Sequence, residues 1–262
     1  MVKVFADTHP GIVRDHNEDS YLIFIPSDER DKRLKGALFA VADGVGGRAK
    51  GEVASRLALE TLKDRYYEKN TTSPLQALKE ALIEAHKRLL KISSESPEHR
   101  GMATTCATLV ITPKGGFLGH VGDSRCYLYR DGELILLTED HTLASLLLKE
   151  GKIKPEEAAV HPQRHILTQA LGAGDFIKPQ LRFVRYKRSD IFLLCSDGLY
   201  DVVSDKAIKS AIESKGLDAG ILLIKMANQA GGPDNITVVL VEVEEDIGTE
   251  SDVPVVVSDD SP

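Results

Sequence analysis

Acidic residues stand at the ends of three apolar segments in this sequence of 262 residues. One apolar segment leads into Asp43-Gly44 and another into Asp197-Gly198, while Asp234 stands shortly before a third. If these segments are buried strands, the three carboxylates lie close together, and clustered carboxylates cannot all stay ionised without a cation. The arrangement therefore predicts a metal site.

A fourth carboxylate, Asp123, ends a further apolar segment and is a candidate for the same site. No cluster of Cys or His accompanies the four acids, so the predicted ligands are oxygen atoms. Oxygen ligands select hard cations, Mg²⁺ or Mn²⁺, over zinc. An Asp-Gly pair after a strand is also a common turn sequence, which remains the alternative for any one of these acids taken alone. Turns alone do not account for four acids at four strand ends.

Arg14 lies near the N-terminus in a segment that also holds Glu18 and Asp19. An arginine beside acids is commonly a solvated surface ion pair. The alternative is that Arg14 presents its fork of donors to a phosphate group beside the metals. In that case Glu18 and Asp19 would hold water molecules bound to the metals.

The negative charge of the chain is concentrated at its C-terminal end. The formal net charge is −7, and residues 244–262 contain seven acids and no Lys or Arg. The rest of the chain then has 33 acids against 33 Lys and Arg. This balance gives no indication of a nucleic-acid surface.

No apolar stretch approaches about 18 residues, so we expect no membrane span. The first residues lack the long apolar stretch of a secretory signal. We therefore expect a cytoplasmic protein, without membrane or nucleic-acid partners, that is a monomer.

The cysteines Cys106, Cys126 and Cys195 are odd in number and widely spaced, which favours buried, reduced thiols. A phosphatase with a cysteine nucleophile needs an arginine six positions after that cysteine to hold the phosphate. Those positions hold other residues: Thr112, Gly132 and Asp201. This excludes a cysteine-based phosphatase.

Two segments, 50–67 and 74–92, have the pattern of amphipathic helices. The second begins with Ser73 as a cap, Pro74 in the first turn and Gln76 to complete a capping box. Its leucines recur at helical spacing, which predicts one buried stripe.

Strands are predicted after these helices. Segments 104–112 and 117–121 are apolar and β-branched, and segments 126–129 and 133–137 flank Asp131-Gly132, a strong hairpin signal. Consecutive strands linked by hairpins indicate antiparallel sheets. The helices must then cover the sheets from outside.

Residues 139–180, called the flap segment below, interrupt this alternation with a short helix at 143–149, prolines, histidines and a glycine-rich stretch. A connection of this length within a domain is usually a lid or a substrate loop. We expect one domain over residues 1–245 and an acidic C-terminal tail over 246–262.

Seven blocks of this sequence occur in the order found in one known family, the metal-dependent protein phosphatases of the type 2C class. The blocks are Arg14-x-x-Asn17-Glu18-Asp19, Val41–Gly47, Gly101–Thr105, Gly122–Arg125, Asp140–Thr142, Ser196–Leu199 and Asp234–Thr237. Together they span roughly residues 5–243, and the chain resembles the compact bacterial form of the family. Seven blocks in order are specific, where any one alone is weak.

The resemblance implies an α+β fold with four layers, an αββα sandwich of two antiparallel sheets with helices outside each. It also implies two Mn²⁺ or Mg²⁺ ions in a cleft at one edge. By the family pattern, Asp43 bridges both metals and the carbonyl of Gly44 binds one. Asp197 and Asp234 hold the second metal, and Asp123 joins Asp197 at a third, weaker site.

The implied activity is hydrolysis of phosphoserine and phosphothreonine in proteins. In the family, a water molecule shared by two metals is the nucleophile, and no covalent phosphoenzyme is needed. Arg14 is expected to hold the phosphate and, with the metals, to neutralise its oxygens as charge shifts.

The source of the proton for the leaving oxygen is open. Animal members of the family have His directly after the first Asp-Gly, and this chain has Val45. The remaining candidates are a water molecule on a metal, or His161 or His165 in the flap segment. A packing or surface role is the alternative for either histidine.

Two other functions remain as alternatives. One is a pseudophosphatase that has lost catalysis and acts as a regulatory binding scaffold, although such proteins usually lose metal-binding acids and this chain retains them. The other is a two-metal phosphodiesterase or nuclease, which would need a surface for nucleic acid that the charge balance and the 5% aromatic content do not offer.

The sequence does not identify the physiological substrates. We expect phosphorylated Ser/Thr proteins as partners, with a Ser/Thr kinase of the same cell, or its targets, among them. The acids of the tail would either solvate the chain end or fold over the cationic metal cleft and compete with substrate at low salt.

Overall fold

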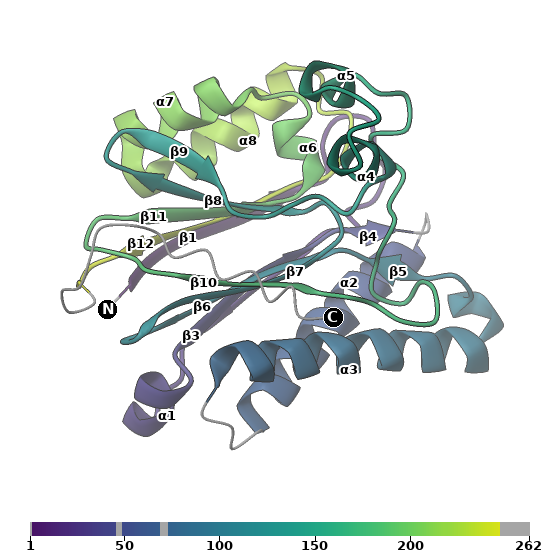
Figure 1. Ribbon diagram of the computed structural model, residues 1–262, viewed down its shortest axis with the longest axis horizontal. Helices are drawn as coiled ribbons and strands as arrows, with labels where there is room; N and C mark the ends of the chain where they lie inside the picture. The colour runs from purple at the N-terminus through teal and green to yellow at the C-terminus, as the bar shows by residue number, and fades with distance from the viewer. Residues whose placement is uncertain (1, 46–48, 69–72, 247–262) are drawn as a thin grey trace.

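A computed structural model describes residues 2–45, 49–68 and 73–246 (Figure 1). Two five-stranded antiparallel sheets pack face to face, and helices cover the outer face of each. The sequence-based expectation of an α+β sandwich with four layers is confirmed. The acidic tail expected over 246–262 lies outside the described residues except for Asp246, whose carboxylate accepts a hydrogen bond from the backbone N–H of Arg188.

The first sheet has the strand order β1-β12-β11-β8-β9. Its strands are β1 (Val2–His9), β12 (Ile236–Val243), β11 (Ile191–Cys195), β8 (Arg125–Arg130) and β9 (Glu133–Leu136). The central strand β11 is buried along its whole length, as its uninterrupted apolar sequence requires.

The second sheet has the strand order β10-β7-β6-β3-β2. Its strands are β10 (Gln180–Val184), β7 (Gly115–Val121), β6 (Cys106–Thr112), β3 (Ala37–Ala42) and β2 (Ser20–Phe24). A separate ladder joins the short strands β4 (Gly44–Val45) and β5 (Ala103–Thr104).

The long helices α2 (Ala49–Glu68) and α3 (Pro74–Glu95) cover the second sheet, and α7 (Asp205–Lys215) and α8 (Ala219–Gln229) cover the first (Figure 1). The remaining helical elements are short: α1 (Glu29–Leu34), η1 (Pro97–His99), α4 (Leu143–Lys149), α5 (Pro155–Ala159), α6 (Asp197–Tyr200) and η2 (Gly216–Asp218). Among the described helices, none is both long and apolar enough to cross a membrane.

Apolar side chains form three clusters that hold the four layers together. One lies between the two sheets and includes Phe39, Leu128 and Phe192. The other two lie between each sheet and its helices, around Leu82 on α3 and Leu223 on α8. The strand ends that carry the acids are therefore fixed by packing on both faces.

Local signals in the sequence predict most of these elements. Ser73 caps α3 and accepts a hydrogen bond from the N–H of Gln76, whose side chain donates to Glu80. Asp131 and Gly132 both have positive φ in the hairpin turn between β8 and β9, as the Asp-Gly signal predicts. The helix expected at 143–149 is α4.

The strand expected over 104–112 is interrupted at Thr105 and forms β5 and β6 instead. The N–H of Thr105 donates to the carbonyl of Asp43, at 2.9 Å, outside both regular ladders. The interruption therefore belongs to the local structure around the first acid.

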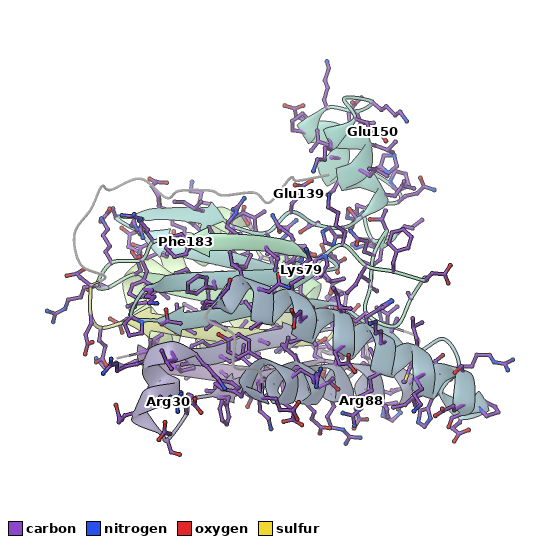
Figure 2. All side chains as sticks on the ribbon, turned by 60° about the horizontal axis from the view of Figure 1, so that its bottom comes forward. Arg30, Lys79, Arg88, Glu139, Glu150 and Phe183 are labelled. Carbon is purple, nitrogen blue, oxygen red and sulfur yellow. The ribbon has the colours of Figure 1, made fainter. Side chains whose placement is uncertain are left out.

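The helices α4 and α5 of the flap segment stand away from the sandwich, with Glu150 at their outer part (Figure 2). Within the segment, Thr142 forms a bridge with Leu167, and the backbone pair of Leu171 with Thr104 joins the segment to the body. It lies at the same end of the sandwich as β4 and α6 (Figure 1).

Candidate metal centre

The predicted acids come together at one end of the sandwich. Asp43 follows β3, Asp197 is the first residue of α6 after β11, and Asp234 lies just before β12. Burial raises the pKa of Asp43 well above its usual range, and the neighbouring carboxylates raise it further: Asp19, Asp197, Asp123 and Asp234. Five carboxylates from both sheets therefore act on one another across a small volume.

Asp43 is held through its backbone. Its N–H donates to the hydroxyl of Thr105 at 2.9 Å, and its carbonyl accepts from the hydroxyl of Thr104 at 2.8 Å. The Thr105 hydroxyl also lies 2.6 Å from that of Ser124, next to Asp123. Two side chains of the Gly101–Thr105 block thus fix the first acid and connect it to the fourth.

Gly44 lies against Gly51 at the start of α2, and neither position has room for a side chain. A Cβ atom on Gly44 would lie 2.2 Å from the carbonyl oxygen of Gly51, and one on Gly51 would lie 2.7 Å from the carbonyl oxygen of Gly44. The N–H of Gly44 also donates to the carbonyl of Glu18. Both glycines are needed for α2 to approach the centre this closely.

Gly198 brings together the two loops that carry Asp197 and Asp234. A Cβ atom on Gly198 would lie 2.1 Å from the carbonyl oxygen of Asn235. The sequence indicates a turn at Asp197-Gly198, but the structure has the first residues of α6 there. The glycine is explained by close packing of two backbones.

Asp19, one of the five carboxylates, is buried, with 7% of its surface exposed. Its Oδ2 accepts hydrogen bonds from the hydroxyls of Ser196, at 2.7 Å, and Thr237, at 2.6 Å. Burial is the main cause that raises its pKa to about 6, and the charge of Asp234 adds to this. Asp19 thus connects β2 to the strands that carry Asp197 and Asp234.

Arg14 lies at the rim and donates from Nη2 to Oδ2 of Asp234 at 2.7 Å. Both side chains are partly exposed, so the ion pair can open at small cost. Arg14 is therefore beside the acids, where the phosphate-binding prediction needs it.

Asn235 fixes the loop that carries Arg14. Its Oδ1 accepts from the N–H of Glu18 at 2.8 Å, and its Nδ2 donates to the carbonyls of Pro10 and His16, each at 2.9 Å. The residue stands in the Asp234–Thr237 block, but its type alone does not show that it joins segments more than 200 positions apart.

Asp123 is 6% exposed and follows β7. Burial raises its pKa to about 7, and Asp140 adds to this shift. The phenol of Tyr200 on α6 donates to the Asp123 backbone carbonyl at 2.9 Å. Burial is the main cause that raises the pKa of Asp197, and the charge of Asp123 adds to it, which joins Asp123 electrostatically to the same cluster.

The donor set fits divalent cations. Within the described part of the chain, one carboxylate oxygen each of Glu18, Asp19 and Asp197 is buried without a hydrogen-bond partner. Such oxygens are costly unless a ligand satisfies them. All the candidate ligands are oxygen atoms, as Mg²⁺ and Mn²⁺ prefer.

The two flap histidines differ in position. His165 Nδ1 lies 3.5 Å from Oδ2 of Asp201, and the ligand atoms of His165, Asp201 and Asp197 lie within 4.8 Å of one another. His161 instead accepts a hydrogen bond from the N–H of Gln163. Val45 is 40% exposed in β4. Sequence reasoning treated the two histidines alike and did not single out Asp201.

The base of the flap segment is joined to the centre by Arg125. Its guanidinium makes a bidentate ion pair with Asp140, with the shortest distance 2.7 Å, and stacks 3.6 Å from the ring centroid of Tyr200. Arg125 and Asp140 both occur in the sequence blocks, but their pairing is visible only in the structure.

Comparison with known proteins agrees with this geometry. The family described as protein phosphatase 2C matches residues 16–217. The serine/threonine protein phosphatase PstP of Mycobacterium tuberculosis is 38% identical over 245 residues, which cover 93% of this chain and 45% of that protein. The serine/threonine phosphatase stp of Listeria monocytogenes is 36% identical over 90% of this chain and 93% of its own length. The chain thus spans less than half of PstP and nearly all of stp.

Solved structures show the same fold. The crystal structure of PstP from Mycobacterium tuberculosis has a TM-score of 0.82 at 37% identity, covering 93% of this chain and 99% of that one. The PstP catalytic domain in complex with two manganese ions has a TM-score of 0.79 at 36% identity, with the same coverage. With these matches and the carboxylate cluster at the sandwich edge, the chain belongs to the protein phosphatase 2C family.

Proposed function

We propose that this protein is a metal-dependent phosphatase that hydrolyses phosphoserine and phosphothreonine monoesters in proteins at a binuclear Mn²⁺ or Mg²⁺ centre. The observation that carries the proposal is the group of five interacting carboxylates, with buried oxygens that lack partners, beside an arginine at the rim. A cation supplies what these oxygens lack. A phosphate monoester supplies an anionic partner for the Arg14 guanidinium when that guanidinium leaves Asp234.

In this proposal Asp43, the carbonyl of Gly44, Asp197 and Asp234 would hold the two ions, with Asp43 shared between them. Asp123 with Asp197 would hold a third, weaker ion. When bound, the ions lower the pKa of a water molecule and neutralise charge on the phosphate. Asp19 accepts from Ser196 and Thr237 through one oxygen, so its other oxygen is free to orient water at the centre.

Arg14 has the substrate-binding role. Its fork of N–H donors matches the oxygens of a phosphate group and stabilises their charge as the ester bond breaks. The Asn235 amide holds the loop on which Arg14 stands, so the guanidinium is positioned before substrate arrives.

His165 is the flap residue that we assign as proton donor to the leaving oxygen. It lies beside Asp201 and Asp197, and His161 does not share that group. His165→Ala should lower kcat on a phosphopeptide more than on an aryl phosphate, whose leaving group needs no proton. His161→Ala is the matched control; equal effects of the two substitutions would remove the assignment.

The relatives named above act, by their names, on Ser/Thr phosphoproteins, and the proposal extends this substrate class to the present chain. A cognate Ser/Thr kinase or its targets, a monomeric state and a cytoplasmic location belong to the same proposal. No nucleic-acid or membrane partner is included.

The decisive experiment measures phosphate release from a phosphothreonine peptide with Mn²⁺, with Mg²⁺ and with chelator. We expect release that requires metal and that Asp234→Asn abolishes, while Asp64→Asn on the exposed side of α2 has no effect. A folded protein that binds Mn²⁺ and releases no phosphate would instead be a scaffold. Faster hydrolysis of a phosphodiester than of the peptide would indicate the nuclease-like alternative.

A further inference from the structure

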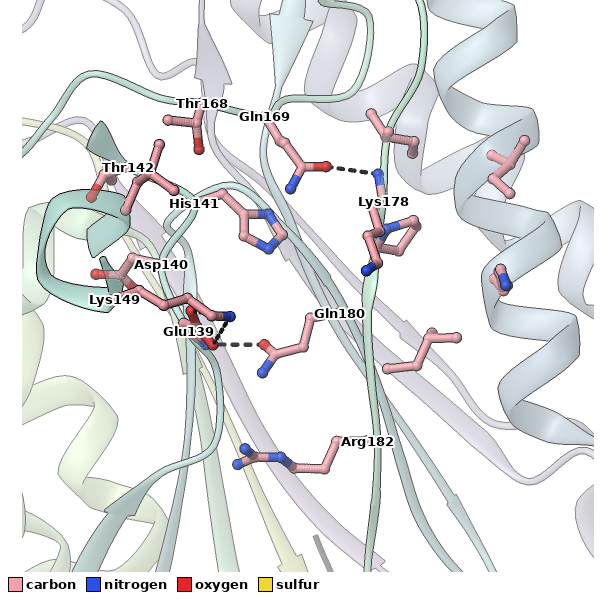
Figure 3. A pocket seen from close by; sticks show the side chains of 16 residues that line it. Glu139, Asp140, His141, Thr142, Lys149, Thr168, Gln169, Lys178, Gln180 and Arg182 are labelled. Carbon is pink, nitrogen blue, oxygen red and sulfur yellow. Dashed lines mark hydrogen bonds and ion pairs between the residues drawn. The ribbon is translucent and has the colours of Figure 1, made fainter. Parts of the chain in front are cut away.

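A recess lies beside the metal centre, between the flap segment, strand β10 and helix α3 (Figure 3). Its volume is about 400 Å³, which accommodates several side chains. Its walls carry four cationic side chains, Lys79, Lys149, Lys178 and Arg182. None of the metal ligands proposed above lines it.

The acids of this recess are already neutralised. Asp140 is held by both arms of the Arg125 guanidinium, and Glu139 pairs with Lys149 at 3.0 Å. In the described part of the chain, Lys79, Lys178 and Arg182 have no ion-pair partner. The recess therefore has an excess of positive charge.

Arg182 gives the clearest indication that an anion belongs here. It is half-buried on β10, and Figure 3 shows its guanidinium reaching into the recess without an interaction to any residue drawn. Burial lowers the pKa of Arg182, and the charge of Glu139 offsets this only in part. An arginine that is partly desolvated and unpaired is unfavourable until an anion joins it.

The other walls supply further cations and uncharged donors. Lys79 lies on the side of α3 near Glu139 and β10 (Figure 2). Nδ1 of His141 accepts from the N–H of Gly122 at 3.1 Å, so a neutral His141 carries its proton on Nε2. The amide of Gln169 already accepts from the N–H of Lys178, which fixes the wall where that lysine stands.

The recess is joined to the metal centre by one short connection. The N–H of His141 donates to the carbonyl of Gly122 at 2.7 Å, and Gly122 precedes Asp123. β10 has a pairing neighbour on one side only among the described strands, and an unpaired strand edge is the feature with which extended peptides pair. An extended peptide advances about 3.3–3.6 Å per residue, so residues near a phosphate at the centre reach the recess.

We propose that this recess is a subsite for an acidic side chain or a second phosphate that lies in the same substrate peptide as the phosphoresidue being hydrolysed. The subsite rests on the proposed phosphatase function and specifies its substrate class: phosphoproteins with acidic residues on one side of the target. Charge complementarity selects this occupant, and the connection through Gly122 and His141 makes it continuous with the phosphate being cleaved.

The test compares kcat/KM for phosphothreonine peptides that differ only in flanking residues: all neutral, glutamates before the phosphothreonine, or glutamates after it. We expect one acidic series to exceed the neutral peptide by about three- to tenfold, a gain that falls as salt is raised. Arg182→Gln combined with Lys178→Gln should bring that ratio close to one. Lys114→Gln combined with Lys215→Gln, an equal loss of two charges at exposed positions that do not line the recess, should leave the ratio unchanged.

A charge reversal tests the subsite in the opposite direction, because Arg182→Glu should favour a lysine-flanked peptide. Equal rates for neutral and acidic peptides in the unaltered protein would overturn the subsite while leaving the phosphatase function intact. Loss of metal-dependent hydrolysis of the neutral peptide would overturn the function itself.

The acidic C-terminal residues are the competing occupant. Neutralising Glu250, Asp252, Asp259 and Asp260 in the full chain should leave the ratio between acidic and neutral peptides unchanged. The contrary result has two parts. Neutralising these acids would raise activity on every peptide, and the combined Arg182→Gln and Lys178→Gln substitutions, with the acids intact, would raise it equally. That result would assign the recess to the chain's own acids and overturn the substrate subsite.

Discussion

At the scale of single residues, the centre combines groups that are unfavourable without metal. Burial is the main cause that raises the pKa of Asp43 and Asp197, and mutual repulsion adds to it. The surrounding hydroxyls of Thr105, Ser196 and Thr237 satisfy only part of the acceptor capacity. The cluster therefore lowers the stability of the metal-free protein and raises its affinity for cations.

Asp43→Asn tests whether the charge of the cluster lowers metal-free stability and provides the affinity for Mn²⁺. The amide keeps the shape of the side chain and removes one charge from the cluster, so the melting temperature of the metal-free protein should rise. The increase in melting temperature on adding Mn²⁺ should largely disappear, and phosphatase activity should fall by at least about 100-fold. Calorimetry with and without Mn²⁺ measures the first two effects. An unchanged Mn²⁺ response would contradict the bridging role, and Asp64→Asn is the control.

Asn235→Ala tests the positioning of Arg14. The substitution leaves the N–H of Glu18 and the carbonyls of Pro10 and His16 without their partner, which should destabilise the protein by about 2–3 kcal/mol. Hydrogen exchange should rise selectively in residues 10–18, and kcat/KM should fall even at temperatures where the variant is folded. Asn228→Ala removes an amide whose Oδ1 has no partner among the described residues. Equal effects of both substitutions would argue against positioning.

At the scale of elements, the centre depends on how closely α6 and the loop before β12 approach. Gly198→Ala places a Cβ atom against the backbone of Asn235, which cannot move without displacing Asp234. We expect a loss of about 1–3 kcal/mol of stability and a loss of about tenfold or more in Mn²⁺ affinity. Gly116→Ala in β7 is the matched control, because its Cβ would lie 3.4 Å or more from its neighbours. Normal Mn²⁺ binding in the Gly198 variant would disprove the packing argument.

The flap segment is held to the body by Arg125. Arg125→Gln leaves Asp140 largely buried without its partner, and we expect a cost of about 3 kcal/mol that is concentrated in the flap segment. Limited proteolysis should cleave within residues 139–180 sooner than in the unaltered protein. Lys187→Gln, which breaks the exposed pair with Asp131, should leave stability nearly unchanged. Cleavage elsewhere in the chain first would show that Arg125 stabilises the body instead.

The same element scale shows what sequence could and could not predict. The cap at Ser73 and the turn at Asp131-Gly132 depend on nearby residues, so the local pattern is sufficient. The acids at the strand ends were identifiable because each follows or precedes an apolar run, and the resemblance supplied the four-layer arrangement of sheets and helices. The bonds of Asn235 and the pairing of Arg125 with Asp140 depend on tertiary contacts, which no local pattern encodes.

Two sequence-based interpretations illustrate the difference. Gly198 fits a turn by its sequence, but its reason is a backbone contact with Asn235, a residue 37 positions away. The two flap histidines are equivalent by type and segment, yet only His165 is grouped with Asp197 and Asp201. Which side of the flap faces the centre is decided by the packing of α4, α5 and the body.

At the scale of the whole molecule, the two sheets meet where the carboxylates repel, so pH should change stability through the cluster. The pKa of Asp19 is raised to about 6 and that of Asp123 to about 7. Between the unfolded value near 3.8 and these folded values, the folded protein binds more protons than the unfolded chain. The metal-free protein therefore loses stability from this cluster as pH rises from about 4 to about 7, on the order of a few kcal/mol.

Buried histidines act in the opposite direction and must be separated from the cluster. Burial lowers the pKa of His86, His120 and His141, so their contribution to stability rises as pH rises toward about 6.5. The difference in melting temperature between Mn²⁺-saturated and metal-free protein cancels this common effect. That difference should grow from pH 5 to about pH 7 and then level off, because Mn²⁺ removes the repulsion only where the carboxylates are ionised. Asp123→Asn should flatten the upper part of this rise, and a difference that is constant across the range would show that the carboxylates are already ionised without metal.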